Sequence, residues 1–175
     1  LALRNTGQFE MAIAIFRTLL SDQFLGADTV FELASLLEQL DRAEEALELY
    51  DRYINKCPFS HETWFNRGFV LSKLGRLRQG IDSYTTALAI REDFAPAWLN
   101  KANNLAYIGS LFEAVEAYWE VLRYEPRDGH AWCGLGNCSA EMEKYTESLQ
   151  YFAKSLECCP DLIEAYLGRG MCYKA

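Results

Sequence analysis

The segment from Gly129 to Leu162 reads GHAWCGLGNCSAEMEKYTESLQYFAKSLECCPDL and has a tryptophan at its fourth place, Trp132. Two more tryptophans, Trp98 and Trp64, precede it at equal intervals of 34 residues. An interval of this length is typical of repeat proteins whose unit is a helix, a turn and a second helix. The spacing therefore predicts a chain built from repeated pairs of helices.

The same interval extends the frame over the rest of the chain. One step before Trp64 is Val30 and one step after Trp132 is Tyr166, and both of these residues are apolar. We therefore predict a single array over residues 1–175. It would comprise a partial repeat at 1–26, full repeats at 27–60, 61–94, 95–128 and 129–162, and the first helix of a further repeat at 163–175.

Small and helix-breaking residues recur in phase with this frame. A small residue at the eighth place allows the two helices of a repeat to approach closely. The eighth-place residues include Gly68, Ala102 and Gly136. Proline lacks the amide hydrogen that continues a helix, so it is expected to end the second helix of a repeat. Three repeats have proline at the thirty-second place and one has glutamate, namely Pro58, Glu92, Pro126 and Pro160.

The seventh place carries leucine in the quoted segment but a cation in three other repeats, Arg67, Lys101 and Arg169. The long alkyl stem of such a residue covers apolar surface while its charge reaches water or a carboxylate. We interpret these three residues as structural, with contact to a partner as the alternative.

Large, small, aromatic and proline residues thus recur at fixed places of each repeat. This arrangement resembles the pattern of the tetratricopeptide repeat (TPR) family. The segment 129–162 matches this pattern through Trp132, Leu135, Gly136, Tyr145, Ser148, Phe152, Ser155 and Pro160. The resemblance covers four full repeats and implies an all-α fold, a right-handed α-solenoid of helix pairs. It also implies a non-catalytic scaffold that binds other proteins in a concave surface lined by the first helices, which we call the groove.

In TPR proteins a recurring set of places on each first helix lines the groove. Carried onto this sequence, those places predict a partner-binding set of Phe65, Asn66, Phe69, Lys73, Leu99, Asn100, Asn103, Tyr107, His130 and Asn137. Asn66 and Asn100 share one place and Asn103 and Asn137 share another, so we expect a ladder of amides. Each amide offers a donor and an acceptor, which matches the backbone of an extended peptide. The alternative is that these side chains cap or hydrate exposed helices.

Large apolar residues of the same set predict a strip beside the amides, suited to the side chains of a peptide or a partner helix. If the frame were shifted by one residue, they would belong to the core instead. Acidic residues near the groove, such as Glu32 and Glu62, favour a neutral to basic partner. The cationic clamp by which chaperone-binding TPR domains hold a C-terminal carboxylate is absent, so we expect no binding of heat-shock-chaperone tails.

Composition argues against several other classes of function. A net charge of −8 disfavours binding to the phosphate backbone of nucleic acid. Six cysteines in a chain able to form its own core fit free thiols and a cytoplasmic location. No apolar run approaches the roughly 20 residues needed to span a membrane.

The spacing of the cysteines and histidines does not suit a metal site or a catalytic site. Cys158 and Cys159 are adjacent, whereas His61 and His130 are far apart in the sequence. We therefore expect no cofactor, metal or enzymatic activity.

Three functional hypotheses remain open at this point. The first is a scaffold that binds a peptide or protein in the groove. The second is the substrate-recruiting arm of a larger enzyme, such as a transferase. The third is a self-assembling scaffold, because an uncapped solenoid end exposes apolar surface that can stack on another copy.

Overall fold

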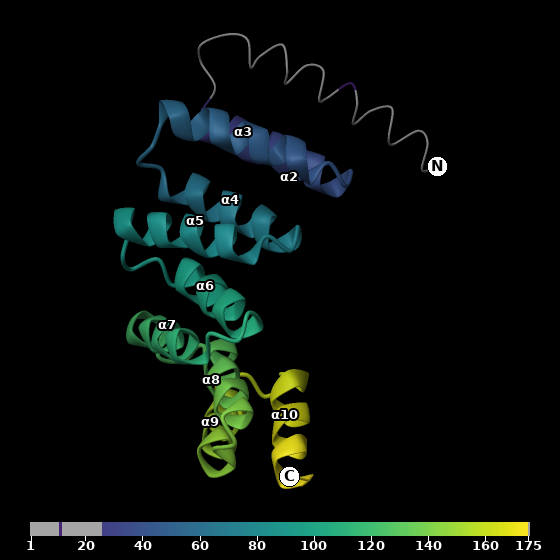
Figure 1. Ribbon diagram of the computed structural model, residues 1–175, viewed down its shortest axis with the longest axis vertical. Coiled ribbons are helices and arrows are strands. Elements are labelled where there is room, and N and C mark those ends of the chain that lie inside the picture. Colours follow the sequence, from purple (N-terminus) through teal and green to yellow (C-terminus); the bar gives the residue numbers. More distant parts are fainter. Residues whose placement is uncertain (1–10, 12–25, 175) are drawn as a thin grey trace.

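The computed structural model describes residue 11 and residues 26–174, in which helices form a stack of pairs (Figure 1). The first helices of the pairs are α2 (Ala27–Gln39), α4 (His61–Lys73), α6 (Ala95–Tyr107), α8 (Gly129–Glu141) and α10 (Ile163–Lys174). The second helices are α3 (Ala43–Lys56), α5 (Leu77–Ile90), α7 (Leu111–Tyr124) and α9 (Tyr145–Cys158). The described residues contain no strand, and the predicted all-α solenoid is confirmed.

The longest of the described helices have 14 residues. None of these helices combines the length and the apolar character needed to cross a membrane. The partial repeat predicted at 1–26 lies outside the described residues, apart from Met11 and Gly26.

Local sequence sets the start of two first helices. Before α4, the Ser60 hydroxyl accepts a hydrogen bond from the Thr63 N–H at 3.3 Å. Before α8, the Asp128 carboxylate accepts one from the Ala131 N–H at 2.8 Å. Such caps satisfy backbone donors that have no partner within the helix.

The three phased tryptophans make the same hydrogen bond. In each case the indole N–H donates to a main-chain carbonyl at the thirty-second place of the preceding repeat. The pairs are Trp64 to Pro58 at 2.9 Å, Trp98 to Glu92 at 2.8 Å and Trp132 to Pro126 at 3.1 Å. Because the acceptor is a main-chain carbonyl, Glu92 accepts the bond as proline does.

The two helices of a repeat approach closely at the eighth place. A methyl group added at Gly136 would lie 2.6 Å from Cε1 of Phe152, whose side chain is fully buried between α8 and its neighbours. The same relation holds between Gly68 and Tyr84. The close approach expected from small residues at this place is therefore confirmed.

The turn inside each repeat requires a left-handed backbone at one place. The residues there are Asp41, Gly75, Gly109 and Glu143, with φ between 59° and 82°. Glycine adopts this conformation freely, whereas a side chain makes it costly. Two of the four repeats therefore contain a strained residue at the turn.

We predict that Glu143→Gly raises the free energy of unfolding by about 0.5–1 kcal/mol, because it removes the strain of a left-handed glutamate. Urea denaturation followed by circular dichroism measures the change. Glu116→Gly is the control, since Glu116 lies exposed in the interior of α7, where glycine should cost about 1 kcal/mol. A Glu143→Gly protein less stable than the parent would contradict the prediction.

Candidate functional site

The first helices form one continuous side of the stack. Each approaches the next closely, from α2 to α4 and onward to α10, whereas the backbones of the described second helices lie farther apart, and α7 and α9 meet only through side chains. The stack is therefore narrower on the side of the first helices, which places them on the inside of its curvature (Figure 1). The predicted groove residues all belong to these first helices, on α4, α6 and α8.

A hollow of about 310 Å³ opens on this side between α6, α8 and α10. Three of the predicted residues line it: Asn103 and Tyr107 from α6, and Asn137 from α8. Tyr107 is 85% exposed, so its ring is available to a ligand. The structure thus brings together residues that are up to one repeat apart in the sequence.

Asn103 is held in position by a tyrosine that reaches it from the second helix of its own repeat. The Tyr118 hydroxyl donates to Oδ1 of Asn103 at 2.7 Å, and burial raises the pKa of Tyr118, so the hydroxyl keeps its proton. This bond engages the amide oxygen. The amide nitrogen of Asn103 makes no hydrogen bond within the described part of the chain and remains a donor for a ligand.

Gly134 gives Tyr118 the space for this contact. A methyl group at Gly134 would lie 2.2 Å from Cζ of the Tyr118 ring. The path of the ring past α8 therefore depends on the absence of a side chain at this position.

The other predicted amides are less engaged. Asn66 and Asn100 are half-buried, and their side chains make no hydrogen bond to any residue that the structure describes. Asn137 is exposed, and its amide nitrogen has only a long contact of 4.0 Å with the Cys133 sulfur. Four amides on α4, α6 and α8 therefore retain donors or acceptors for a partner.

The predicted apolar residues differ in how far they are available. Phe65 is half-buried and packs edge-on against Phe94, with 5.1 Å between ring centroids. Leu99 is half-buried against the core formed with α7 and α8. Phe69 is 39% exposed. The strip therefore includes residues that also stabilise the fold.

The two predicted basic or ionisable residues lie apart from the hollow. The Lys73 ammonium pairs with Glu38 at 2.8 Å and lies 4.5 Å from the centroid of the Phe69 ring. His130 is exposed near the start of α8. The charge of Lys73 is therefore partly neutralised by the neighbouring repeat.

Several residues that the sequence frame did not select also line the hollow, among them Tyr118, Glu141, Gly168 and Met171. Glu141 occupies the thirteenth place of its repeat, and Met171 the ninth place of the last helix. Both are places that the family pattern assigns to the groove, so the same frame carried to the end of the chain would have found them. Tyr118 belongs to a second helix, and its contact follows only from the packing.

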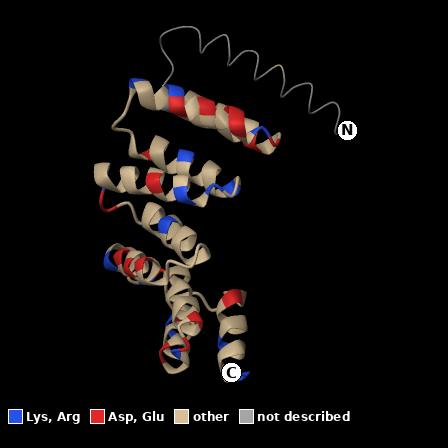
Figure 2. Ribbon diagram, viewed as in Figure 1, with Lys and Arg blue, Asp and Glu red and all other residues tan. Residues whose placement is uncertain are grey.

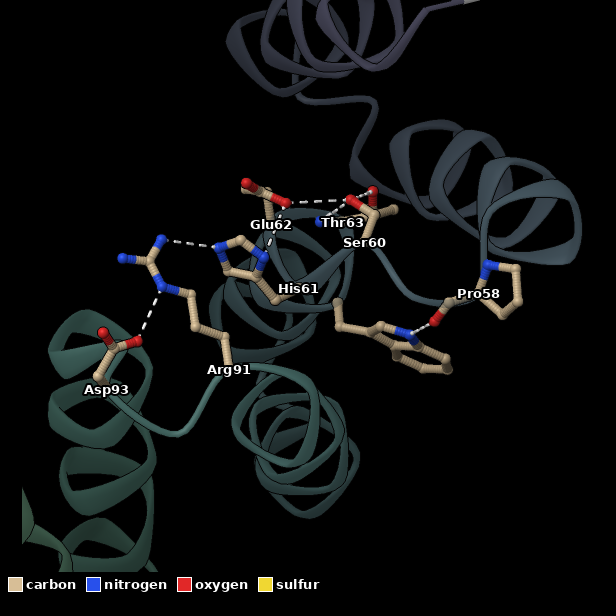
Figure 3. A network of polar contacts seen from close by, with 8 residues as sticks. Pro58, Ser60, His61, Glu62, Thr63, Arg91 and Asp93 are labelled. Atoms are coloured by element: carbon tan, nitrogen blue, oxygen red, sulfur yellow. Dashed lines mark hydrogen bonds and ion pairs between the residues drawn. The ribbon is translucent and has the colours of Figure 1, made fainter.

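His61 lies outside the groove in a polar network (Figure 3). Its Nδ1 is 3.1 Å from the Glu62 carboxylate and its Nε2 is 3.2 Å from the Arg91 guanidinium. Arg91 in turn donates to Asp93 at 2.9 Å. This network ties the start of α4 to the loop before α6.

Three family models match the chain, each described as a tetratricopeptide repeat, at residues 27–70, 61–94 and 99–163. The chain belongs to the tetratricopeptide repeat family. No curated protein matches it by sequence comparison.

Solved structures share the TPR fold with this chain at low sequence identity. A crystal structure of MamA is 21% identical, with a TM-score of 0.80 over 89% of this chain and 91% of that one. YrrB, described as a TPR protein with an unusual peptide-binding site, is 20% identical, with a TM-score of 0.80 over 97% and 87%. A thermophilic TPR protein of Thermus thermophilus is 18% identical, with a TM-score of 0.71 over 99% and 95%. At these identities the likeness establishes the fold alone.

We predict that Gly134→Ala lowers the free energy of unfolding by about 1–3 kcal/mol, because the added methyl group overlaps the Tyr118 ring. Urea denaturation measures the loss. Gly170→Ala is the matched control: Gly170 is exposed on α10 with nothing within 4 Å of an added methyl group, so alanine there should be neutral or stabilising. Equal stability of the Gly134→Ala protein and the parent would contradict the proposed crowding.

Proposed function

We propose that this TPR protein is a scaffold whose groove binds an extended peptide or a partner helix. The observation that carries the proposal is the row of amides on successive first helices, with donors or acceptors left unengaged beside a hollow of about 310 Å³. An extended backbone presents alternating C=O and N–H groups. An asparagine amide can donate a hydrogen bond to the first and accept one from the second. YrrB, with the same fold, is described as having a peptide-binding site, and this supports the proposal.

The proposed binding residues are the ten predicted from the sequence, together with Met171 and Glu141 at the hollow. We assign them two tasks. The amides hold the backbone of the partner, and the exposed rings of Phe69 and Tyr107 contact its side chains. Half-buried Phe65 and Leu99 support this surface from beneath.

The charge of the surroundings favours a neutral to basic partner. Glu32, Glu141 and Glu164 are exposed on the first helices, and the chain has a net charge of −8. Complementary charge acts mainly on the association rate and on the choice of partner. We assign no cofactor and no catalytic residue to the groove.

We also propose a cytoplasmic location and a single continuous array as the organisation of the chain. The location rests on the six cysteines, all of which are free thiols and would persist in a reducing compartment. The continuous array rests on contacts between each described helix and the next from α2 to α10.

The groove proposal predicts that Asn66→Ala, Asn100→Ala and Asn103→Ala together abolish capture of a partner from cell extract. Loss of three hydrogen bonds at about 1 kcal/mol each weakens binding by a factor on the order of 100. Pull-down with identification by mass spectrometry, followed by titration calorimetry with the captured protein, measures the loss.

Asn55→Ala is the matched control for that experiment, because Asn55 is exposed on α3, outside the groove. Circular dichroism checks that all variants remain folded. If the triple variant captures the same proteins with the same affinity as the Asn55→Ala control, the groove is not the binding site.

Self-association is a second candidate function, and α10 favours it. Ile163, Leu167 and Met171 are 63–68% exposed on this helix, and Tyr173 is 74% exposed. A contiguous apolar surface of this kind is suited to packing against another copy. Nothing in the described residues favours the enzyme-arm hypothesis in the same way.

We predict that Leu167→Glu reduces self-association, because it places a charge in the middle of this apolar surface. Light scattering over a concentration series measures the mean mass. Gln150→Glu, which adds the same charge at an exposed position on α9, is the control and should behave as the parent. A parent protein that stays monomeric at high concentration would exclude this second function.

A further inference from the structure

A second hollow, of about 620 Å³, lies on the opposite face of α6 from the groove. Residues that line it include Ile81 from α5, Trp98, Lys101 and Leu105 from α6, and Glu113 and Glu116 from α7. We call it the outer cleft. Successive residues of a helix are rotated by about 100°, so residues two places apart, such as Lys101 and Asn103, point in nearly opposite directions. The outer cleft and the groove are therefore separate surfaces.

The corresponding position one repeat earlier is occupied by side chains of the protein itself. There Arg67 donates to Asp51 of the preceding second helix at 2.7 Å and to Ser83 of its own second helix at 2.8 Å. The arginine thus links α3 to α5 across the outer face of α4. This contact confirms the structural role expected of Arg67.

The corresponding position one repeat later is also occupied. Trp119, Trp132 and Tyr151 pack on one another there, with ring centroids 5.4–6.1 Å apart. Lys154 lies over the Trp132 ring at 4.3 Å. Aromatic rings thus join α7 to α9 across the outer face of α8.

At the outer cleft, both partners of the Arg67 bridge are replaced. Thr85 stands one repeat after Asp51 and Ala117 one repeat after Ser83, so the carboxylate and the serine hydroxyl that hold Arg67 are both absent here. The hydroxyl of Thr85 donates instead to the main-chain carbonyl of Ile81 at 2.8 Å. Lys101, the counterpart of Arg67, forms no ion pair among the described residues and lies 5.1 Å from the Trp98 ring centroid. It is half-buried, and desolvation lowers the pKa of its ammonium. The bridge between neighbouring second helices is therefore missing at this repeat.

The rim of the outer cleft is acidic on the side of α7. Figure 2 shows acidic residues along this helix. Glu113 and Glu116 are exposed there and have no ion-pair partner in the described part of the chain. A third carboxylate of the rim, Glu120, pairs with Arg123 at 3.3 Å. The floor, formed by Ile81, Trp98 and Leu105, is apolar.

We propose that the outer cleft docks a segment of a partner protein in which a large apolar side chain lies next to an arginine or lysine. The apolar side chain occupies the space over Ile81, Trp98 and Leu105 that the neighbouring repeats fill with their own residues. The cation pairs with Glu113 and Glu116, which have no partner within the described residues. Lys101 opposes the incoming cation, so its charge weakens the binding that the two glutamates strengthen. This proposal does not depend on peptide binding in the groove.

Selection from a library of random short peptides displayed on phage tests this proposal with the whole chain as bait. A Glu113→Gln, Glu116→Gln variant is used for counter-selection, so that only peptides needing these carboxylates are kept. We expect the kept peptides to combine arginine or lysine with leucine, phenylalanine or tryptophan. A synthetic peptide of the enriched sequence should bind the double variant about tenfold more weakly than the parent, because two exposed ion pairs are lost.

Three further variants make the expected result specific. Lys101→Met, which keeps an apolar stem over Trp98 and removes the opposing charge, should bind the peptide more tightly. Glu157→Gln with Asp161→Asn removes two exposed charges elsewhere and should bind as the parent does. The Asn66→Ala, Asn100→Ala, Asn103→Ala variant should also bind normally, since its changes lie in the groove.

The proposal is overturned if no peptide survives counter-selection or if the enriched peptides lack a cationic residue. It is equally overturned if Lys101→Met weakens binding, or if the groove variant abolishes it. The last result would place the peptide in the groove and support the first proposed function instead. Circular dichroism of each variant confirms that a loss of binding does not come from unfolding.

Discussion

The hydrogen bond from each phased indole to a main-chain carbonyl of the preceding repeat fixes how neighbouring helix pairs meet. Trp64, Trp98 and Trp132 all make it, at 2.8–3.1 Å. A single pair of helices cannot bury its apolar faces alone, so each repeat is stabilised by packing on the next. Packing of this kind is not directional, whereas the indole bond is. The three bonds therefore add a directional contact to the register in which first helix follows first helix.

That register decides what the inner surface presents. With the first helices in contact, residues at one place of successive repeats come near one another, and Asn103 and Asn137 line the same hollow. The contact of Asn103 with Tyr118 adds a link from the second helix to this surface. The inner surface therefore combines neutral amides and aromatic rings, a chemistry suited to backbone groups and apolar side chains.

The outer surface is formed by the same helices but has a different chemistry. The gap between neighbouring second helices is closed by an arginine bridge at Arg67 and by stacked aromatic rings at Trp132. At Lys101 it stays open beneath a rim of carboxylates. One repeat thus offers two surfaces, an inner one with amides and aromatic rings and an outer one with a negative rim. The two proposed binding sites thus share α6.

The sequence by itself determined the helix pairs. Equal intervals of 34 residues and the phased small residues carry that information, because helical periodicity is a local property of the chain. The resemblance to the TPR family added a prediction of which face of each first helix lines the groove. It also placed Asn103, Tyr107 and Asn137 in the set that lines one hollow.

The tertiary structure alone decided which side chains meet between elements. That Tyr118 passes Gly134 to reach Asn103, and that Arg67 finds Asp51 and Ser83, depends on how two or three helices pack together. The open cleft at Lys101 arises in the same way, because the two partners that hold Arg67 one repeat earlier are missing. Thr85 stands at the place of Asp51 and Ala117 at the place of Ser83, on two other helices. Repeat periodicity assigns a residue to a face of its own helix, but the contacts of that face are set by side chains whose positions follow only from the packed arrangement.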